Sequence, residues 1–356
     1  CTRFTAEVLK KKLVEHGLLN RVKVIVPATD ERLQIGPFNV QWLPLTHSVP
    51  DPNALMIRTP AGNILHTGDW KLDPEPMVGH GYRQETFTQL AAEGVRAMVC
   101  DSTNATVNGH SASEGELYEG LRHYIETAPG RVIVTCFGSN IARLLTLSHI
   151  ADDTGRYMGL YGRSMVTMFQ CAKRAGVWPY SAGTVDTGHL GYLPRHEVLA
   201  VATGSQGEPR TALRRLATGT HPDFDLEPGD RVIFSARAIP GNEDAIAGLI
   251  RQLESRGVEV ITAEMAIKPI HASGHPAQQE LETLYRWVKP QIAIPVHGEA
   301  VHMQAHAELA KACGVPRTLT GRNGDLFMLS NNPGIQRQKV QTGRLGWDKG
   351  KLVRVV

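Results

Sequence analysis

The spacing of apolar residues along the chain predicts strands and helices in alternation almost from end to end. A helical pattern opens the chain at residues 2–18 and is expected to end at Gly17. Short apolar runs follow it at 22–26, 38–45, 54–59 and 63–67. Because turn residues separate these runs, the pattern predicts strands of an antiparallel meander.

The rhythm changes near residue 113. Before it, residues 96–101 form an apolar run that ends in Asp101. After it come regular strand–loop–helix units, whose strands are RVIVTC (131–136), RYMGLYG (156–162), VLAVATG (198–204) and RVIFSA (231–236). Such units predict a parallel, doubly wound α/β domain at 113–264.

The pattern changes again in the last quarter of the chain. Residues 265–330 supply a helix, the strand QIAIPV, a second helix and a terminal strand. Residues 331–356 are polar and rich in glycine, and we expect them to form a linker. Two domains therefore follow from the pattern, and the 356 residues are enough for both.

Composition narrows the possible partners. The chain is 42% hydrophobic and 21% charged, and no apolar run is long enough to span a membrane. A net charge of +3 is too small for a broad basic face, so any polyanion site must be local.

Five cysteines occur without a CxxC pair. Since Cys100 and Cys136 lie in apolar runs, we expect buried reduced thiols and a cytoplasmic protein.

Candidate metal ligands follow three predicted strands. His47 comes after the strand at 38–45, Asp69 lies in a glycine turn after 63–67, and His297 leaves the strand QIAIPV. Imidazole and carboxylate groups suit zinc or manganese, and strand ends are where open α/β sheets bind ligands. Taken singly, each residue also fits a structural role at a turn. Asp101 ends a further strand, where it could orient a metal-bound histidine or cap the following turn.

The densest polar cluster is His271-Ala272-Ser273-Gly274-His275, just before a predicted helix. Backbone N–H groups, a hydroxyl and imidazoles together can hold a phosphate, and His275 could act as a general acid. The alternative is an ordinary helix cap by Ser273.

Short loops after the strands of the inserted domain add further donors. Ser139 and Asn140 follow one strand, and Arg163 and Ser164 follow another. Several such loops suggest a track for phosphates, with Arg163 as the best bidentate contact. Ordinary βα turns, which favour the same residues, are the alternative.

In order and spacing, these motifs resemble the ribonuclease J family. The segments that carry the resemblance are LTHSVPD, IRTPAGNILHTGDWKLD, DSTNA, YGRSM, TGSQGEP, IPGNE, HASGH and KPQIAIPVHGE. The resemblance extends over about residues 1–345. It implies a metallo-β-lactamase αββα sandwich, incomplete here, built from residues 1–112 and 265–330, with a β-CASP domain inserted at 113–264.

The resemblance also implies a role for each matching residue. His47, Asp69 and His297 match the family's metal ligands, and Asp69 takes the position that bridges two ions. Asp101 matches the β-CASP acid, and His275 matches the histidine that protonates the leaving group. The HASGH segment matches the stretch that receives a nucleotide phosphate.

The activity implied by the resemblance is hydrolysis of single-stranded, 5′-monophosphorylated RNA, from the 5′ end or internally. Two zinc ions would serve each site, with manganese or magnesium as substitutes, in a cytoplasmic homodimer that contacts no membrane. The family's HxHxDH metal segment is not found in this sequence. We therefore expect a chain truncated at both ends that holds an incomplete metal site and is inactive alone. An inactive RNA-binding homologue and a small-molecule metallo-hydrolase remain as alternatives.

Overall fold

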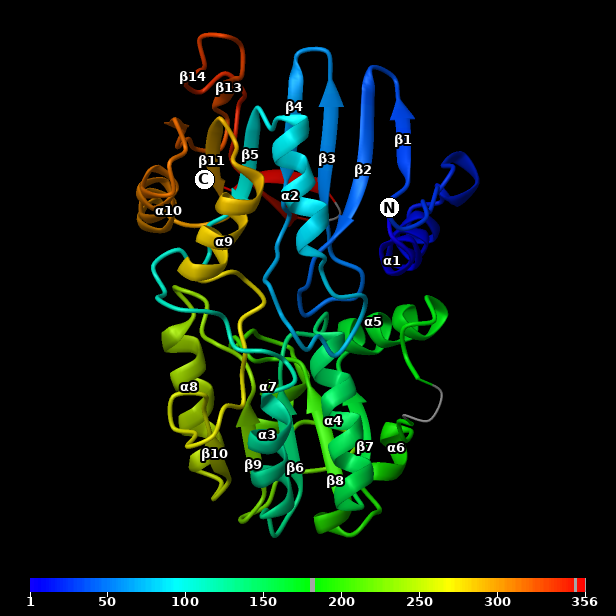
Figure 1. The fold of residues 1–356 in the computed structure, drawn as a ribbon. Coiled ribbons are helices and arrows are strands. Elements are labelled where there is room, and N and C mark those ends of the chain that lie inside the picture. Colours follow the sequence, from blue (N-terminus) through cyan, green and yellow to red (C-terminus); the bar gives the residue numbers. More distant parts are fainter. Residues whose placement is uncertain (180–182, 349–350, 356) are drawn as a thin grey trace.

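The computed structural model describes residues 1–179, 183–348 and 351–355, which form two lobes stacked end to end (Figure 1). A seven-stranded sheet builds one lobe, and a five-stranded sheet builds the other. No helix among the described residues is long and apolar enough to cross a membrane.

The seven-stranded sheet has the order β1-β2-β3-β4-β5-β11-β12. Its strands are β1 (Arg32–Ile35), β2 (Phe38–Pro44), β3 (Asn53–Thr59), β4 (Gly62–His66), β5 (Ala97–Asp101), β11 (Ile292–Val296) and β12 (Arg317–Thr318). The first four strands pair antiparallel, which confirms the predicted meander, whereas β4, β5, β11 and β12 run parallel.

One strand prediction in this lobe was wrong. Residues 22–26 form no strand, and Val22, Ile25 and Val26 are exposed. The edge strand is instead β1, a less apolar segment that pairs with β2 through a tight turn at Gly36. β-branched residues favour a strand only where a neighbouring strand offers hydrogen bonds, and residues 22–26 have no such partner.

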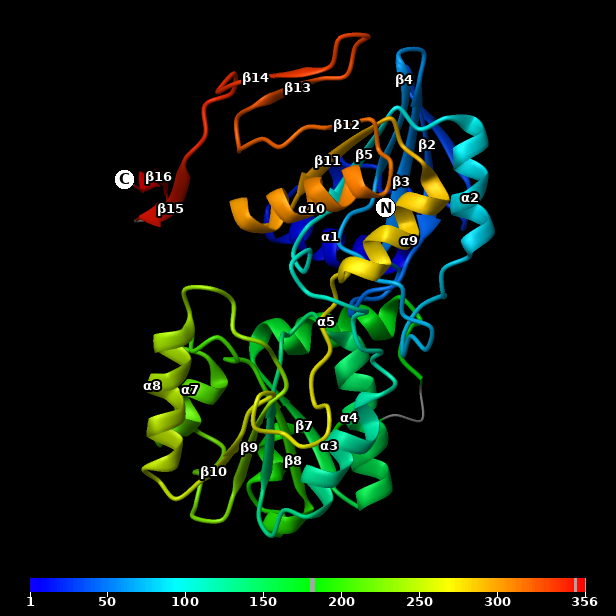
Figure 2. The same cartoon turned by 60° about the vertical axis from the view of Figure 1, so that its left-hand side comes forward.

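Helices α2 (Gln84–Glu93) and α9 (Gln278–Val288) pack on one face of this sheet over buried residues such as Met56, Leu65 and Met98. The opposite face contacts the small sheet of β13 (Leu326–Met328) and β14 (Gly334–Gln336) through Phe327. Helix α10 (Ala300–Ala312) lies beside β11 (Figure 2). Apolar side chains that alternate along each strand therefore fix which face receives the helices.

The second lobe is a parallel sheet with the strand order β10-β9-β6-β8-β7. Its strands are β6 (Val132–Thr135), β7 (Tyr157–Tyr161), β8 (Val198–Ala202), β9 (Arg231–Phe234) and β10 (Glu259–Ile261). Helices α3 (Leu117–Glu126), α4 (Ile141–Thr154) and α5 (Arg163–Arg174) pack on one face, and α6 (Thr187–Leu190), α7 (Ala212–Ala217) and α8 (Glu243–Glu254) on the other. This arrangement confirms the doubly wound prediction.

The chain crosses between the lobes twice, outward along residues 102–116 and back along 262–277. Helix α1 (Arg3–Glu15) of the opening segment packs on α5, where Lys11 donates to the Thr167 hydroxyl over 2.7 Å. Two short 3₁₀ turns lie at Leu19–Arg21 and Arg195–Glu197.

The predicted linker at 331–356 contains β14 and an antiparallel hairpin of β15 (Arg344–Asp348) and β16 (Lys351–Val355). Its polar composition did not indicate these strands. The domain boundaries at residues 112, 264 and 330 stay predictions.

Candidate metal and phosphate site

Five of the predicted site residues meet at one edge of the first lobe's sheet, four of them at the ends of strands. Asp69 follows β4, Asp101 ends β5 and His297 follows β11, and these three strands are parallel neighbours. Their carboxyl ends therefore lie at one edge of the sheet. His47 follows β2 at the same edge, and the return crossing brings His275 to it.

The ligand atoms form two groups that share His275. One group is His47, Asp69 and His275, and the other is Asp101, His275 and His297; within each group all ligand atoms lie within 4.8 Å of one another. The imidazole Nε2 of His297 also lies 3.5 Å from Asp69 Oδ1. Imidazoles and carboxylates at this spacing fit a divalent cation of the zinc or manganese kind. The predicted ligands His47, Asp69 and His297 thus lie close together.

Each of two histidines has one ring nitrogen in a short hydrogen bond. Nδ1 of His47 lies 2.6 Å from the Gly274 carbonyl oxygen, and Nδ1 of His275 lies 2.6 Å from Asp101 Oδ2. Nε2 of each ring remains outside these bonds. Holding the far nitrogen in this way fixes the tautomer and the direction of a metal-binding or proton-transferring ring.

A side chain at residue 274 would disturb this arrangement. A Cβ atom built on Gly274 would lie 2.2 Å from Cε1 and 2.3 Å from Nδ1 of His47. Such a contact is far inside van der Waals distance, so only glycine lets the backbone approach the ring.

Both carboxylate oxygens of Asp101 are engaged. Oδ2 holds His275, and Oδ1 accepts from the backbone N–H of Thr103 over 2.9 Å and from its hydroxyl over 2.7 Å. The residue is buried. It therefore caps the turn at Thr103 and orients a histidine at the same time, which fits an orienting carboxylate better than a metal ligand.

The environment shifts the two histidines in opposite directions. Burial and the neighbouring His275 lower the pKa of His47, which favours the neutral ring that binds a metal. Burial by itself would also lower the pKa of His275, but the hydrogen bond and charge of Asp101, together with Asp69, raise it above its usual value. Neighbouring groups whose pKa values move apart are typical of paired roles in catalysis.

In the HASGH segment, Ser273 is not the helix cap that we considered. Helix α9 begins at Gln278, and the N–H of Ala277 is held by the Glu280 carboxylate over 2.8 Å. The Ser273 hydroxyl oxygen accepts instead from Asn104 Nδ2 over 2.7 Å and from the His275 N–H over 3.2 Å. Its own proton thus remains available to a ligand.

The other members of the segment differ in exposure. Ala272 is buried and His271 is half-buried. Burial, with the nearby charge of Arg143, lowers the pKa of His271 to about 3. His271 is therefore a neutral ring at neutral pH.

The predicted donor loops of the second lobe form a separate group. Ser139 is exposed before α4, and Arg163 and Ser164 are exposed at the start of α5. These loops touch, since a Cβ on Gly138 would lie 3.2 Å from the Ser164 hydroxyl oxygen. No hydrogen bond between described residues joins Arg163 or Ser164 to the histidine cluster. Asn140 is buried, and its side chain caps α4 by accepting from the N–H of Arg143 over 2.9 Å.

Sequence reasoning missed two buried groups near the site. The ring of His306 on α10 lies between two hydroxyl groups. Its Nδ1 is 2.9 Å from the Ser102 hydroxyl oxygen, and its Nε2 is 2.8 Å from the Tyr285 hydroxyl oxygen. A set of buried charges, Lys71, Asp73, Glu114 and Arg143, lies between the lobes. His306 sits inside an ordinary helical pattern, so its position gave no signal. Charged residues outside apolar runs are expected at the surface, so the sequence did not indicate that these four charges are buried.

Two family models match the chain, and together they cover just over half of it. The description "Ribonuclease J, beta-CASP domain" matches residues 129–253, and "Zn-dependent metallo-hydrolase RNA specificity domain" matches residues 260–317. The first range lies in the second lobe, and the second includes the HASGH segment and His297.

The curated relatives agree with these family models. Ribonuclease J of Sinorhizobium meliloti is 40% identical over 350 residues, covering 98% of this chain and 62% of the relative. Ribonuclease J of Thermus thermophilus is 38% identical over 334 residues, covering 92% of this chain and 58% of the relative. The chain thus spans about three-fifths of the length of these relatives.

A solved structure of an Enterococcus faecalis protein of unknown function has a similar fold. It covers 90% of this chain and 73% of its own, with a TM-score of 0.60 at 14% identity. Together with the family models, the two lobes confirm a metallo-β-lactamase fold with an inserted β-CASP domain. The chain belongs to the ribonuclease J family.

Proposed function

We propose that this protein is a metal-dependent ribonuclease that hydrolyses RNA phosphodiesters. The observation that carries the proposal is the position of His275, which lies beside the candidate ligands His47, Asp69 and His297 and is oriented by Asp101. With the candidate phosphate-binding segment HASGH and these three candidate ligands, the site would suit a phosphodiester. The family relationship supports the same reaction.

His47, Asp69 and His297 would hold the metal. A bound divalent ion would supply hydroxide at neutral pH and stabilise negative charge on the phosphate. The Gly274 carbonyl keeps His47 aimed at that position, because it holds the far ring nitrogen.

His275 would protonate the oxygen that leaves when the phosphodiester bond breaks. Its Nε2 is free for this purpose, and the Asp101 carboxylate stabilises the protonated ring that must be present before transfer. The Ser273 hydroxyl, the His271 ring and the backbone of Ala272 and Gly274 would hold the substrate phosphate.

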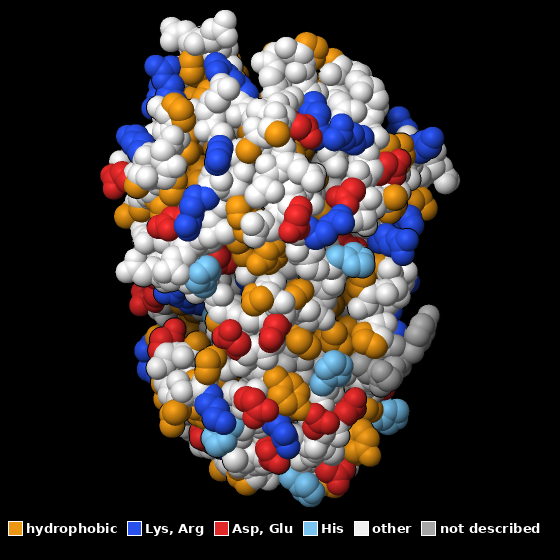
Figure 3. Space-filling view, viewed as in Figure 1, with side chains coloured by type: hydrophobic (Ala, Val, Ile, Leu, Met, Phe, Trp, Pro, Cys, Tyr) orange, Lys and Arg blue, Asp and Glu red, His pale blue; other side chains and the backbone are white. Residues whose placement is uncertain are grey.

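The RNA would be a single strand that enters between the lobes, past Ser139, Arg163 and Ser164. On the face shown in Figure 3, basic and acidic side chains are intermingled rather than gathered into one basic surface. This distribution fits a local track for one strand better than a broad duplex-binding face. A 5′-monophosphate preference, 5′-to-3′ as well as internal cleavage, and a homodimer belong to the same proposal.

We further propose zinc as the working metal, with manganese or magnesium able to replace it, and a cytoplasmic location. The free, buried Cys100, Cys136 and Cys171 support a reducing compartment. The intact histidine geometry argues against an RNA-binding homologue without activity, since such a protein has no need for the Asp101–His275 pair. The inserted lobe argues against a small-molecule hydrolase.

The test measures metal content and RNA cleavage with the same preparations. The 356-residue chain, and that chain preceded by the corresponding segment of the Sinorhizobium meliloti relative, would be analysed for zinc and given a 5′-monophosphorylated RNA with Zn²⁺ or Mn²⁺. We expect the extended chain to bind metal and to cleave this RNA.

Matched variants separate the site from the scaffold. Asp69→Asn should lose metal and cleavage, whereas His275→Ala should lose cleavage. His196→Ala, at an exposed histidine of the second lobe, is the control and should keep both. Full cleavage by the extended Asp69→Asn protein, or none by any extended protein that holds stoichiometric zinc, would overturn the proposed function.

A further inference from the structure

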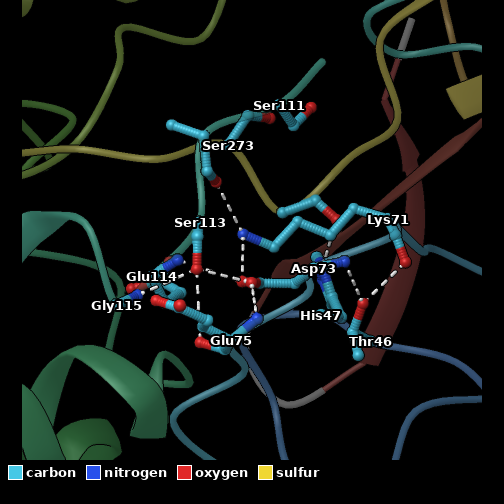
Figure 4. Close-up of polar contacts among 12 residues, drawn as sticks. Thr46, His47, Lys71, Asp73, Glu75, Ser111, Ser113, Glu114, Gly115 and Ser273 are labelled. Atoms are coloured by element: carbon cyan, nitrogen blue, oxygen red, sulfur yellow. Dashed lines mark hydrogen bonds and ion pairs between the residues drawn. The ribbon is translucent and has the colours of Figure 1, made fainter. Parts of the chain in front are cut away.

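A chain of buried polar contacts joins the two lobes beneath the candidate site. It begins at Thr46, the neighbour of His47, whose hydroxyl oxygen accepts from the N–H of Asp73 over 2.8 Å and whose proton goes to the Lys71 carbonyl over 2.7 Å. Lys71 and Asp73 form a buried ion pair of 2.9 Å. Figure 4 shows these groups close together, with His47 among them.

The Asp73 carboxylate carries the contacts to the outward crossing. Oδ1 accepts from the Ser113 hydroxyl, and Oδ2 accepts from the N–H of Glu114 over 3.0 Å (Figure 4). The Lys71 ammonium group also donates to the Ala112 carbonyl over 3.0 Å. The buried Lys71–Asp73 ion pair of the first lobe thus holds three consecutive residues of the crossing, Ala112 through Lys71 and Ser113 and Glu114 through Asp73.

Glu114 then binds Arg143 on α4 of the second lobe. The guanidinium donates to both carboxylate oxygens over 3.2 Å, and the side chains of Arg143 and Glu114 are 0% and 1% exposed. A buried bidentate pair has one geometry, so it transmits position from one lobe to the other.

Arg143 also contacts the return crossing, residues 262–277, through its Nη1 atom. Nη1 donates to the Ser235 carbonyl over 3.0 Å and to the Ile270 carbonyl over 3.3 Å, and the Ser235 hydroxyl donates to that same Ile270 oxygen over 2.6 Å. Ile270 directly precedes His271. Four residues later, the Gly274 carbonyl contacts His47, next to the starting point at Thr46.

The contacts therefore form a closed ring through both lobes and both crossings. We propose that Glu114 and Arg143 are positioning residues that set the HASGH segment, and with it His275, against the metal-binding edge of the first lobe. This inference rests on the proposed function, because that function gives the segment its phosphate and its proton transfer. Both side chains are buried, so they would act through the residues that they hold.

Buried charges of this kind also have a purely structural explanation, so the test must separate placement from stability. Hydrogen exchange by mass spectrometry on the 356-residue chain would follow peptides that cover residues 268–279, under conditions where every variant is folded. Histidine-selective NMR would follow the Nδ1 protons of His47 and His275, which are held at Gly274 and Asp101.

Arg143→Lys keeps the charge but removes the planar fork that reaches Ile270. We expect exchange in 268–279 to become at least about tenfold faster, the factor for losing one hydrogen bond to a charged group, and the His47 and His275 ring protons to exchange faster too. The matched control is Arg156→Lys, because Arg156 is also buried but donates to Ala128, Gly130 and Val198 carbonyls. In Arg156→Lys, residues 268–279 and the two ring protons should exchange as slowly as in the unaltered chain.

If Arg143→Lys does not fold, Arg143→Met with Glu114→Leu removes both charges together and leaves none unpaired. The same local loss of protection is then expected. Equal exchange in 268–279 for the Arg143 variants and the Arg156→Lys control would overturn the inference. Because these measurements need neither metal nor RNA, a protein that never cleaves RNA would refute the proposed function and leave this comparison intact.

Discussion

His306 gives the sharpest prediction about stability. Its side chain is fully buried on α10 and contacts the hydroxyl groups of Ser102 and Tyr285. Burial lowers its pKa from 6.5 to about 4. The folded protein therefore keeps this ring neutral in a pH range where the unfolded chain protonates it.

The sign and size of the effect follow from this difference. Below pH 6.5 the unfolded state binds the proton first, so the stabilisation is present above that pH and is lost as the pH falls toward 4. At 1.36 kcal/mol per pKa unit, moving from about pH 7 to about pH 5 removes about 2 kcal/mol of unfolding free energy through this one residue.

The assay is urea unfolding of the unaltered chain and of His306→Gln at both pH values. Glutamine can donate to one hydroxyl and accept from the other but does not titrate in this range. All other groups are shared, so their pH dependence cancels in the comparison. We expect the unaltered chain to lose about 2 kcal/mol more than His306→Gln on acidification. Equal losses would refute the reasoning.

Other predictions concern the site and its supports. Gly274→Ala puts a methyl group against the His47 ring, so the Zn²⁺ affinity of the extended protein, measured by competition with a chelating dye, should fall about 10- to 100-fold without loss of fold. Asp73→Ala leaves a buried ammonium group unpaired and should lower the free energy of urea unfolding by about 3–5 kcal/mol; a change under about 1 kcal/mol would contradict this. Asp101→Asn removes the charge that raises the pKa of His275, so that pKa, followed by NMR titration, should fall; an unchanged value would exclude Asp101 as its cause.

Much of the fold could be predicted from the sequence because local patterns determine it. Alternating apolar residues in 38–67 encode an antiparallel meander, and the strand–loop–helix rhythm after residue 113 encodes a parallel sheet. The secondary-structure predictions that were wrong concern two short segments. Residues 22–26 have strand composition but no neighbouring strand, and the hairpin of β15 and β16 lies in a segment whose polar residues indicate a linker.

The sequence indicated which residues would meet at this edge of the sheet, but not the hydrogen bonds that orient them. His47, Asp69 and His297 could be chosen because each follows a strand, and parallel strands end at one edge. By contrast, the contact that Gly274 makes with His47 depends on a carbonyl that meets a residue 227 positions away. Burial of Arg143 and Glu114 likewise depends on how two lobes meet, which no local pattern encodes.

The most direct test of the central claim asks whether His275 protonates the leaving oxygen. An RNA with sulfur in place of that bridging oxygen would be given to the extended protein and to its His275→Ala and Asp69→Asn variants, with zinc present. Thiolate leaves without a proton, so the account predicts that His275→Ala regains most of its lost rate on this substrate and that Asp69→Asn does not. A His275→Ala protein that stays equally slow on both substrates would contradict the account.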